Sequence, residues 1–335
     1  MTAPLLQVDG LVKHFSMHKP FLSRLTDRSP AQVVRAVDGL SFGIERGQTL
    51  SLVGESGCGK STVAKLIMGL QGATGGSLRF DGQALGADRP AALRQRMQMI
   101  FQDPYASLNP RWRVARIIAE PLRTYGMITD ARALRAEVDR LLEFVGLAAA
   151  DGDKFPHEFS GGQRQRISIA RAISTKPEFL VCDEPTSALD VSVQAQILNL
   201  MRQLQRDLGL TYLFISHDLA VVNYISDWIG VMYLGRLVEL APAQDILTRP
   251  KHPYTKLLLD TVPDISMKNR DAVRLAGEVP NPITPPSGCH FNPRCPMAEA
   301  RCRVDVPLVR PIGDTRVACH LAEDETPTPQ LRKAG

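Results

Sequence analysis

The sequence lacks the features of a membrane-spanning, exported or nucleic-acid-binding chain. No apolar run reaches the roughly 18 residues that a spanning helix needs, and the opening MTAPLLQVDG has neither a basic segment nor an apolar signal core. With 40 Lys and Arg against 35 Asp and Glu, the net charge of +5 is far below that of proteins whose main ligand is a nucleic-acid backbone. We therefore expect a soluble chain with no nucleic-acid partner, whose mildly basic surface is compatible with a nearby membrane.

Cysteine is scarce in most of the chain and concentrated near its end. Only Cys58 and Cys182 occur in the first two thirds, and the others are Cys289, Cys295, Cys302 and Cys319. In a chain without an export signal, such a cluster more often binds metal than forms disulfides. The 335 residues are 44% hydrophobic, which is enough to bury a core and excludes wholesale disorder.

Strand and helix patterns alternate through the first three quarters of the chain. Strand patterns cover residues 39–53, as two strands around a turn, and residues 98–101, 179–182 and 212–215. Helical spacing of apolar residues covers residues 60–68, residues 131–145 before Gly146, and a segment that closes near Gly209. This alternation predicts an α/β domain with a parallel sheet and a helical insertion.

A change of composition divides the chain near residue 250, beyond which prolines crowd between Pro280 and Pro311. We predict a first domain over residues 1–250, with a helical subdomain over about residues 104–175. A small Pro/Cys-rich extension over residues 251–335 follows and ends in a flexible tail. Residues 16–33 form a basic insertion, for which a solvated loop is the default and contact with lipid headgroups or a partner chain is the alternative.

The segment GESGCGKS fits the phosphate-loop pattern, and it lies at the strand-loop-helix corner that this pattern requires. Glycines let backbone N–H groups curl around phosphate oxygens, and the helix N-terminus adds its dipole. Lys60 would reach the β and γ phosphates and Ser61 would ligate Mg²⁺, whereas a flexible glycine turn is the alternative that the context disfavours. We read Cys58 as a small residue without a redox role. The predicted ATP-binding residues here are Gly54, Glu55, Ser56, Gly57, Cys58, Gly59, Lys60, Ser61 and Thr62.

The apolar strand at residues 179–182 runs into two carboxylates, Asp183 and Glu184. Such a pair projects from the carboxyl edge of a parallel sheet, where ligands bind in these folds. Asp183 can contribute to the Mg²⁺ shell and Glu184 can polarise an attacking water. Because acidic pairs after strands are also common turn residues, this interpretation needs support from other motifs.

That support comes from motifs that stand in the order typical of the ATP-binding cassette (ABC) family, which the chain resembles over roughly residues 5–250. They are Gln102, the FSGGQ segment that begins at Phe159, the SALD segment at residues 187–190, and His217 in Ser216-His217-Asp218. The resemblance implies a P-loop NTPase fold of the ABC type with a helical signature subdomain. Phe159 replaces the usual leucine of the signature and keeps an apolar anchor.

The resemblance also implies a head-to-tail dimer, in which each ATP lies between the phosphate loop of one chain and the signature of the other. In this arrangement Glu184 acts as base, His217 contacts the γ-phosphate, and Gln102 senses Mg²⁺ and water. The implied Mg²⁺ ligands are Ser61, Gln102 and Asp183, and Phe15 would stack on adenine. The implied signature residues are Ser160, Gly161, Gly162 and Gln163, and those of the D-loop are Ser187, Ala188, Leu189 and Asp190.

One phosphate loop, one signature and no sustained heptads favour a transporter subunit over the soluble cassette ATPases of translation, repair and chromosome architecture. GESGCGKS, FQDPYASLNPR and the C-terminal stretch resemble the ATPase subunits of bacterial dipeptide and oligopeptide importers. Importers of nickel, glutathione and some sugars share these features, so they remain alternatives. The resemblance implies a peripheral protein on the cytoplasmic face of the inner membrane. Its implied partners are a second ATPase subunit, favoured to be a paralogue, two transmembrane permease subunits and an external solute-binding protein.

The cysteines of the extension follow the spacing C-x5-C-x6-C-x16-C. Zinc sites usually contain tighter knuckles, and four loosely spaced thiolates with Pro296 after Cys295 suit an iron–sulfur cluster better. The resemblance also points to a 4Fe-4S cluster, while zinc and free thiols remain alternatives. Because we expect the extension to lie away from the phosphate loop, we predict a structural metal without a part in hydrolysis, with a regulatory role as a hypothesis.

Overall fold

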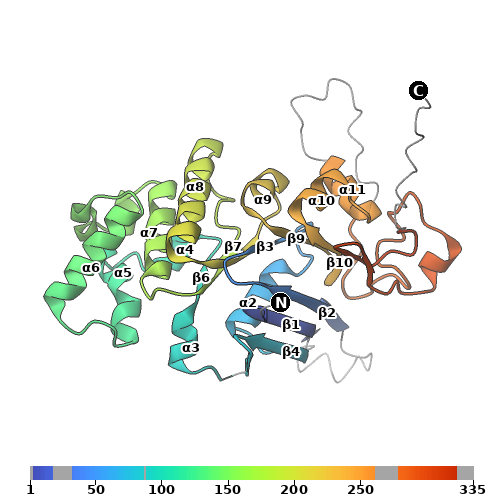
Figure 1. Ribbon diagram of the computed structural model, residues 1–335, viewed down its shortest axis with the longest axis horizontal. Helices are drawn as coiled ribbons and strands as arrows, with labels where there is room; N and C mark the ends of the chain where they lie inside the picture. The colour runs from blue at the N-terminus through green and yellow to red at the C-terminus, as the bar shows by residue number, and fades with distance from the viewer. Residues whose placement is uncertain (1–2, 18–31, 87, 261–277, 323–335) are drawn as a thin grey trace, which may run out of the picture.

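The structure is a computed structural model that describes residues 3–17, 32–86, 88–260 and 278–322 (Figure 1). Residues 18–31 of the insertion and the tail beyond residue 322 lie outside the described residues, so the predictions for the insertion and the tail stay predictions. Among the helices that the structure describes, none combines the length and the apolarity needed to cross a membrane.

An eight-stranded sheet forms the centre of the molecule (Figure 1). Its parallel part has the spatial order β9 (Trp228–Tyr233), β3 (Thr49–Val53), β8 (Thr211–Ile215), β7 (Phe179–Asp183) and β6 (Met97–Ile100). Antiparallel strands continue it beyond β9 as β10 (Arg236–Pro242), β12 (Thr315–Val317) and β11 (Arg310–Ile312). The predicted α/β fold is therefore confirmed, and the extension adds two strands to the same sheet.

Alternation along the buried strands explains why both faces of this sheet are covered. Every residue of β7 and β8 is buried, and successive side chains point to opposite faces. One face packs against the helical part through Leu180, Cys182, Tyr212 and Phe214. The other face packs against α2 and the second sheet through Phe179, Val181, Leu213 and Ile215.

A four-stranded antiparallel sheet lies beside the central one and encloses α2 (Lys60–Met68) with it. Its strands have the order β2 (Gln32–Ile44), β1 (Leu6–Met17), β4 (Gly75–Phe80) and β5 (Gln83–Ala84). The predicted strand, turn and strand over residues 39–53 are present, but β2 and β3 belong to different sheets. The turn between them therefore carries the chain from one sheet to the other.

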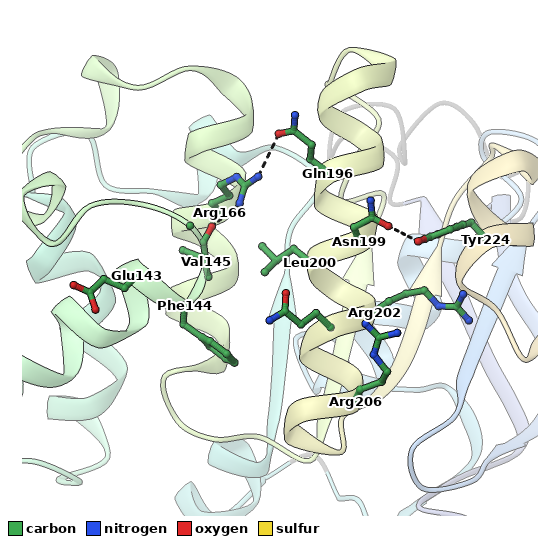
Figure 2. Close-up of a pocket in the computed structure, with 12 residues that line it drawn as sticks. Glu143, Phe144, Val145, Arg166, Gln196, Asn199, Leu200, Arg202, Arg206 and Tyr224 are labelled. Atoms are coloured by element: carbon green, nitrogen blue, oxygen red, sulfur yellow. Dashed lines mark hydrogen bonds between the residues drawn. The ribbon is translucent and has the colours of Figure 1, made fainter.

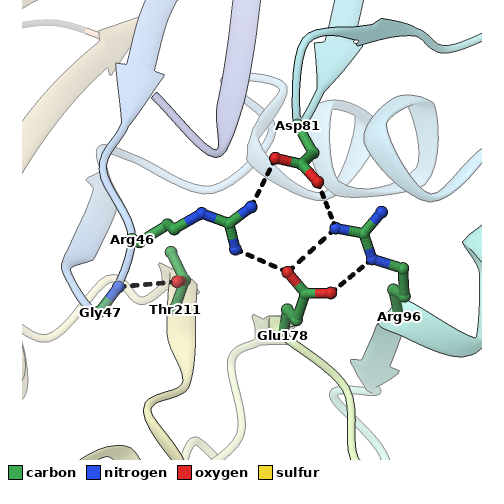
Figure 3. A network of polar contacts seen from close by, with 6 residues as sticks. All are labelled: Arg46, Gly47, Asp81, Arg96, Glu178 and Thr211. Atoms are coloured by element: carbon green, nitrogen blue, oxygen red, sulfur yellow. Dashed lines mark hydrogen bonds and ion pairs between the residues drawn. The ribbon is translucent and has the colours of Figure 1, made fainter. Parts of the chain in front are cut away.

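Four charged side chains join the two sheets at the amino ends of the parallel strands (Figure 3). Arg46 precedes β3, Asp81 follows β4, Arg96 ends α3 (Ala91–Arg96), and Glu178 precedes β7. Arg46 contacts Asp81 at 2.5 Å and Glu178 at 2.6 Å, and Arg96 contacts the same two carboxylates at 2.6 and 2.5 Å. Each cation thus bridges both anions in a closed ring.

Helices between β6 and β7 form the predicted helical insertion. They are α4 (Pro104–Ser107), α5 (Val114–Thr124), α6 (Ala131–Phe144), the short 3-10 turns η1 (Ala149–Asp153) and η2 (Pro156–Glu158), and α7 (Gly161–Ile173). The pattern over residues 131–145 corresponds to α6, and Gly146 takes a left-handed φ of 75° just beyond it. The helix expected to close near Gly209 is α8 (Val191–Leu208).

The segment after β8 builds a third core around aromatic side chains. It contains α9 (Leu219–Ile225), α10 (Ala243–Thr248), α11 (Pro253–Asp260) and the 3-10 turn η3 (Ala300–Arg303). Tyr233 of β9, Tyr254 of α11 and Phe291 of the extension pack together with ring centroids 4.7 to 5.2 Å apart. The division at residue 250 stays a prediction, because the parts on either side of it share this core and one sheet.

Candidate functional site

The phosphate loop joins the carboxyl end of β3 to the first turn of α2. Gly54 and Gly59 have φ values of 148° and 107°, which disfavour any residue with a side chain. A Cβ at Gly54 would lie 2.2 Å from the Met232 oxygen, and one at Gly59 would lie 2.1 Å from the Ala36 oxygen. The loop thus fits between β9 and β2 only because both positions are glycine.

Lys60 begins α2 and turns its side chain into this loop. The buried Nζ donates hydrogen bonds to the oxygens of Gly54 at 2.6 Å and Glu55 at 3.0 Å. Cys58 is buried beneath the loop, and burial raises the pKa of its thiol. A raised pKa keeps the thiol neutral and unreactive, which agrees with the interpretation of Cys58 as a small packing residue.

Ser61 and Asp183 meet although they come from different elements. Ser61 Oγ, in the first turn of α2, donates a hydrogen bond of 2.9 Å to Asp183 Oδ1 at the end of β7. Burial raises the pKa of Asp183, and the neighbouring Glu184 carboxylate adds to this effect. A hydroxyl and a carboxylate side by side are oxygen ligands of the kind that Mg²⁺ prefers. The two side chains therefore fit the predicted Mg²⁺ site.

Two other predicted catalytic side chains contact the Glu184 carboxylate. Gln102 Nε2 donates a hydrogen bond of 3.1 Å to Glu184 Oε2, and His217 Nδ1 lies 3.3 Å from the same oxygen. Glu184 itself has a left-handed φ of 47°, although it is not glycine. Strained backbone of this kind clusters at functional sites, where surrounding contacts fix it. Here Glu184 N–H donates to the Ile215 oxygen at 3.0 Å, which ties the ends of β7 and β8 together.

The signature residues form the amino end of α7. Ser160 caps the helix, because its Oγ accepts from Gln163 N–H while Gln163 Oε1 accepts from Ser160 N–H. Ser160 and Gln163 are exposed, whereas Phe159 is buried in the helical core as an apolar anchor. A Cβ at Gly162 would lie 2.4 Å from Val193 Cγ1 of α8, so the signature packs closely against that helix.

The D-loop residues connect Glu184 to α8. Ser187 Oγ and Ser187 N–H both donate to the backbone oxygen of Glu184, at 3.1 and 3.3 Å. Ala188 is exposed, Leu189 packs against the helical core, and Asp190 stands at the cap of α8. The backbone of the proposed base is therefore fixed by the loop that follows it.

The structure leaves some predicted residues apart from this cluster. No hydrogen bond among the described residues joins the signature to the phosphate loop, and Figure 1 places α7 in the helical part, away from α2. Phe15 lies half-buried on β1 with Lys13 Nζ 4.9 Å from its ring centroid. Ser56, Gly57 and Thr62 are in the loop and α2, where Gly57 has a φ of 79° and open space at its Cβ position.

Two residues that sequence reasoning missed contact the phosphate loop. Arg294 of the extension forms an ion pair with Glu55, with distances of 2.7 and 2.9 Å, and Tyr254 Oη accepts from Glu55 N–H at 3.0 Å. The expectation that the extension lies away from the phosphate loop is therefore wrong. The signal in the sequence was an arginine beside a cysteine, which by itself points to no partner.

The four cysteines of the extension lie near one another. Burial raises the pKa of the Cys289 thiol to about 11, and the charges of Cys319, Cys302 and Cys295 add to this effect. Cys289 N–H also donates to the Cys302 oxygen at 2.9 Å. Within the described residues, however, no group of three or more His, Cys, Asp or Glu side chains is placed to hold a metal ion. The structure thus gives the predicted iron–sulfur or zinc site no support.

A pocket of about 680 Å³ lies between the end of α6, α7 and α8 (Figure 2). Arg166, Arg202 and Arg206 line it together with polar residues of α8. Arg166 already donates to the Val145 oxygen and to Gln196, and Arg202 lies 5.1 Å from the Tyr224 ring. Its arginines are thus partly engaged, and none of the predicted site residues lines it.

The fold and the site define a P-loop ATPase of the cassette type, and comparison with known proteins agrees. The sequence model of the ABC transporter family matches residues 37–187, and that of the oligopeptide/dipeptide transporter C-terminal region matches residues 238–302. The dipeptide transport ATP-binding protein DppF of Escherichia coli is 45% identical over 98% of this chain and 97% of that protein. The oligopeptide transport ATP-binding protein AppF of Bacillus subtilis is 46% identical over 95% and 97%.

Solved structures show the same fold. CbiO1 of Clostridium perfringens, part of the ABC transporter complex cbiONQ, superposes with a TM-score of 0.62 at 26% identity, over 74% of this chain and 92% of that one. The cassette MJ0796, solved as a dimer, has the same TM-score at 23% identity, over 71% of this chain and 98% of that one, and so informs the fold alone. The chain belongs to the ATP-binding subunits of the ABC transporter family.

Proposed function

We propose that this chain hydrolyses ATP to drive uptake of dipeptides or oligopeptides into a bacterial cell, from the cytoplasmic face of the inner membrane. The observation that carries the hydrolysis is the convergence of Gln102 and His217 on Glu184, next to the Ser61–Asp183 pair. Its peptide substrate is supported by the named relatives and by the matched C-terminal region. Import of nickel, glutathione or another small solute is the alternative.

In the proposed reaction the phosphate loop and Lys60 bind the phosphates of ATP, and Glu184 takes a proton from the attacking water. Bound Mg²⁺ would neutralise phosphate charge, with Ser61, Asp183 and Gln102 as its ligands. Gln102 and His217 orient the Glu184 carboxylate through the contacts described above. The exposed Ser160 and Gln163 leave the amino end of α7 open to an anion on a second cassette. That second cassette completes each site in the head-to-tail dimer.

We further propose that a permease subunit docks in a groove of about 270 Å³ between β6 and the helical part. Leu70 and Phe101 line the groove with 57% and 38% of their surfaces exposed. Phe101 directly precedes Gln102, so a partner pressing on Phe101 would act on the contact between Gln102 and Glu184. Phe101→Ser should then release the permease, whereas Leu208→Ser, at an apolar residue exposed at the end of α8, should not.

The cysteine cluster enters here as a separate proposal, in which Cys289, Cys295, Cys302 and Cys319 bind one metal centre. It rests on the spacing of the four cysteines in the sequence and on the hydrogen bond of 2.9 Å from Cys289 N–H to the backbone oxygen of Cys302. Iron with acid-labile sulfide in anaerobically purified protein would identify an iron–sulfur cluster. Stoichiometric zinc without sulfide would identify a zinc site instead. Four freely alkylated thiols in the native complex would refute the proposal.

The test of the function starts from the tagged chain, purified from solubilised membranes of the cells that make it. Mass spectrometry should identify two permease subunits and a second, paralogous ATPase. After reconstitution into vesicles with the solute-binding protein, labelled peptides should accumulate only with Mg-ATP. Accumulation of nickel or glutathione, but not of peptides, would establish the alternative, and a chain without membrane partners would contradict transport.

A further inference from the structure

The C-terminal extension contacts the phosphate loop through a partly buried ion pair. Arg294 Nη1 and Nη2 donate separately to the two carboxylate oxygens of Glu55, at 2.7 and 2.9 Å. Only 4% of the Arg294 side chain is exposed, against 21% for Glu55. A two-pronged arginine–carboxylate contact fixes both position and orientation, so the second residue of the phosphate loop is set by a residue 239 positions away.

The backbone of Glu55 also forms a hydrogen bond with a residue beyond residue 250. Glu55 N–H donates to Tyr254 Oη at 3.0 Å, and Tyr254 is fully buried against Tyr233 and Phe291. Arg294 Nη1 also reaches Tyr233 Oη at 3.4 Å. The side chain and the N–H of Glu55 therefore both depend on the aromatic core that the extension completes.

The charge of Glu55 makes this contact consequential for nucleotide binding. Lys60, the proposed phosphate-binding lysine, donates from Nζ to the backbone oxygen of Glu55 at 3.0 Å, so the two residues are neighbours. A carboxylate without a partner beside that loop would repel the negatively charged oxygens of a bound phosphate. The positive charge of Arg294 balances the negative charge of Glu55, so the ion pair leaves no net charge beside the loop.

Arg294 in turn takes its position from the cysteine segment. Its N–H donates to the Phe291 oxygen at 3.0 Å, and Asn292 N–H donates to the Cys289 oxygen at 2.9 Å. Cys295 follows Arg294 directly in the chain. A change in the fold of this segment therefore moves the guanidinium that faces the phosphate loop.

We propose that Arg294 is a positioning residue for nucleotide binding, which neutralises and orients Glu55 and so makes the affinity of the phosphate loop depend on the folded C-terminal extension. The proposal rests on the ATP site proposed above. By linkage, a nucleotide bound at the loop must stabilise the extension to the same degree as the extension strengthens binding.

The first experiment measures binding of Mg-ATP to the full chain and its variants. Arg294→Ala should raise Kd on the order of tenfold or more, because it leaves a carboxylate without its partner. Adding Glu55→Gln removes the carboxylate that Arg294→Ala leaves without a partner, so the double variant should bind more tightly than Arg294→Ala and come to within about threefold of the wild type. Arg303→Ala, which removes an exposed arginine of the same extension, is the matched control and should bind normally. In the assembled complex, Arg294→Ala should raise KM with little change in kcat.

The second experiment measures amide hydrogen exchange over residues 289–302, with and without Mg-ADP. Nucleotide should slow exchange in the wild type and in Arg303→Ala, and this protection should be lost in Glu55→Gln, which keeps the arginine and the aromatic core. Should Arg294→Ala fail to fold, Arg294→Lys replaces it and should weaken binding to a smaller extent.

Wild-type affinity in Arg294→Ala, or a double variant as weak as Arg294→Ala, would overturn the proposal. Nucleotide protection of residues 289–302 that persists in Glu55→Gln would overturn it too. A wild-type chain that does not bind Mg-ATP would instead refute the proposed ATP site, so the two failures are distinguishable.

Discussion

The two edges of the parallel sheet carry charged side chains in opposite ways. At the amino edge, Arg46 and Arg96 each bridge Asp81 and Glu178, and hydrogen bonds from Arg96 and then Arg46 lower the pKa of Glu178. At the carboxyl edge, burial raises the pKa of Asp183, and a second carboxylate follows it immediately. One edge compensates its charges within the fold, and the other concentrates negative charge beside the phosphate loop.

This difference separates residues that stabilise the fold from residues that we propose take part in the chemistry. In a closed ring of ion pairs each charge has a partner of opposite sign within the protein, so no ligand is needed to balance it. Adjacent carboxylates at the end of a strand are unfavourable for the protein alone and become favourable when a cation binds, which is the usual compromise between stability and activity. Substitutions at the carboxyl edge should therefore lower activity, and substitutions at the amino edge should lower stability.

The sharpest test of this comparison is the same substitution at both edges. Glu184→Gln should reduce ATP hydrolysis by about 10²–10⁴-fold, because it removes the proposed base, while ATP binding and thermal stability stay near wild type. Glu178→Gln is the matched control and should leave hydrolysis nearly unchanged. Phosphate release and nucleotide binding by the purified complex measure both. Near-normal turnover in Glu184→Gln would contradict the role of Glu184.

Adjacent glycines of the signature give the next largest effect, this time on stability. Gly162→Ala places a Cβ 2.4 Å from Val193 Cγ1, whereas Gly161→Ala meets Leu189 Cδ2 at an ordinary 3.5 Å. Because valine has one favoured rotamer in a helix, α7 or α8 must shift, and Gly162→Ala should lose about 1–3 kcal/mol of unfolding free energy. Gly161→Ala should be neutral by the same denaturant titration. Equal losses would show that the signature does not depend on α8.

At the carboxyl edge, Asp183→Asn should raise stability while it abolishes Mg²⁺-dependent hydrolysis. The folded pKa of Asp183 is raised by burial, so the ionised side chain destabilises the folded protein at pH values above that pKa. An asparagine oxygen can still accept the hydrogen bond from Ser61. Thermal melts without nucleotide should show a gain at pH 8 that shrinks as the pH falls. A lower melting temperature at pH 8 would contradict this account.

Local patterns predicted much of this molecule from the sequence. Three elements could be predicted because hydrophobic periodicity and glycine placement act over a few residues. They are the strand before the phosphate loop, the helix from Lys60 to Met68 and the strand that ends at Asp183. Contacts between distant residues were not, since periodicity carries no information on them. The Arg294–Glu55 pair spans 239 positions, and the strained φ of Glu184 arises only when β7 meets β8.

The smallest expected effect is the pH dependence that Glu178 contributes at the amino edge. Its folded pKa is lowered below the ordinary 4.5, so its ion pairs stabilise the folded protein fully above that value. This stability is lost as the pH falls through the lower folded pKa. Because about a third of the side chain is exposed and solvent screens the pairs, the contribution should be below about 1 kcal/mol.

Denaturant titrations from pH 7 to pH 3 should therefore show a slightly smaller loss of unfolding free energy in Glu178→Gln than in the wild type. The gap between the two proteins should narrow further in 1 M salt, where the screening length is about 3 Å. A gap that is independent of both pH and salt would mean that Glu178 acts through packing, and the contrast between the two edges would then lose its electrostatic basis.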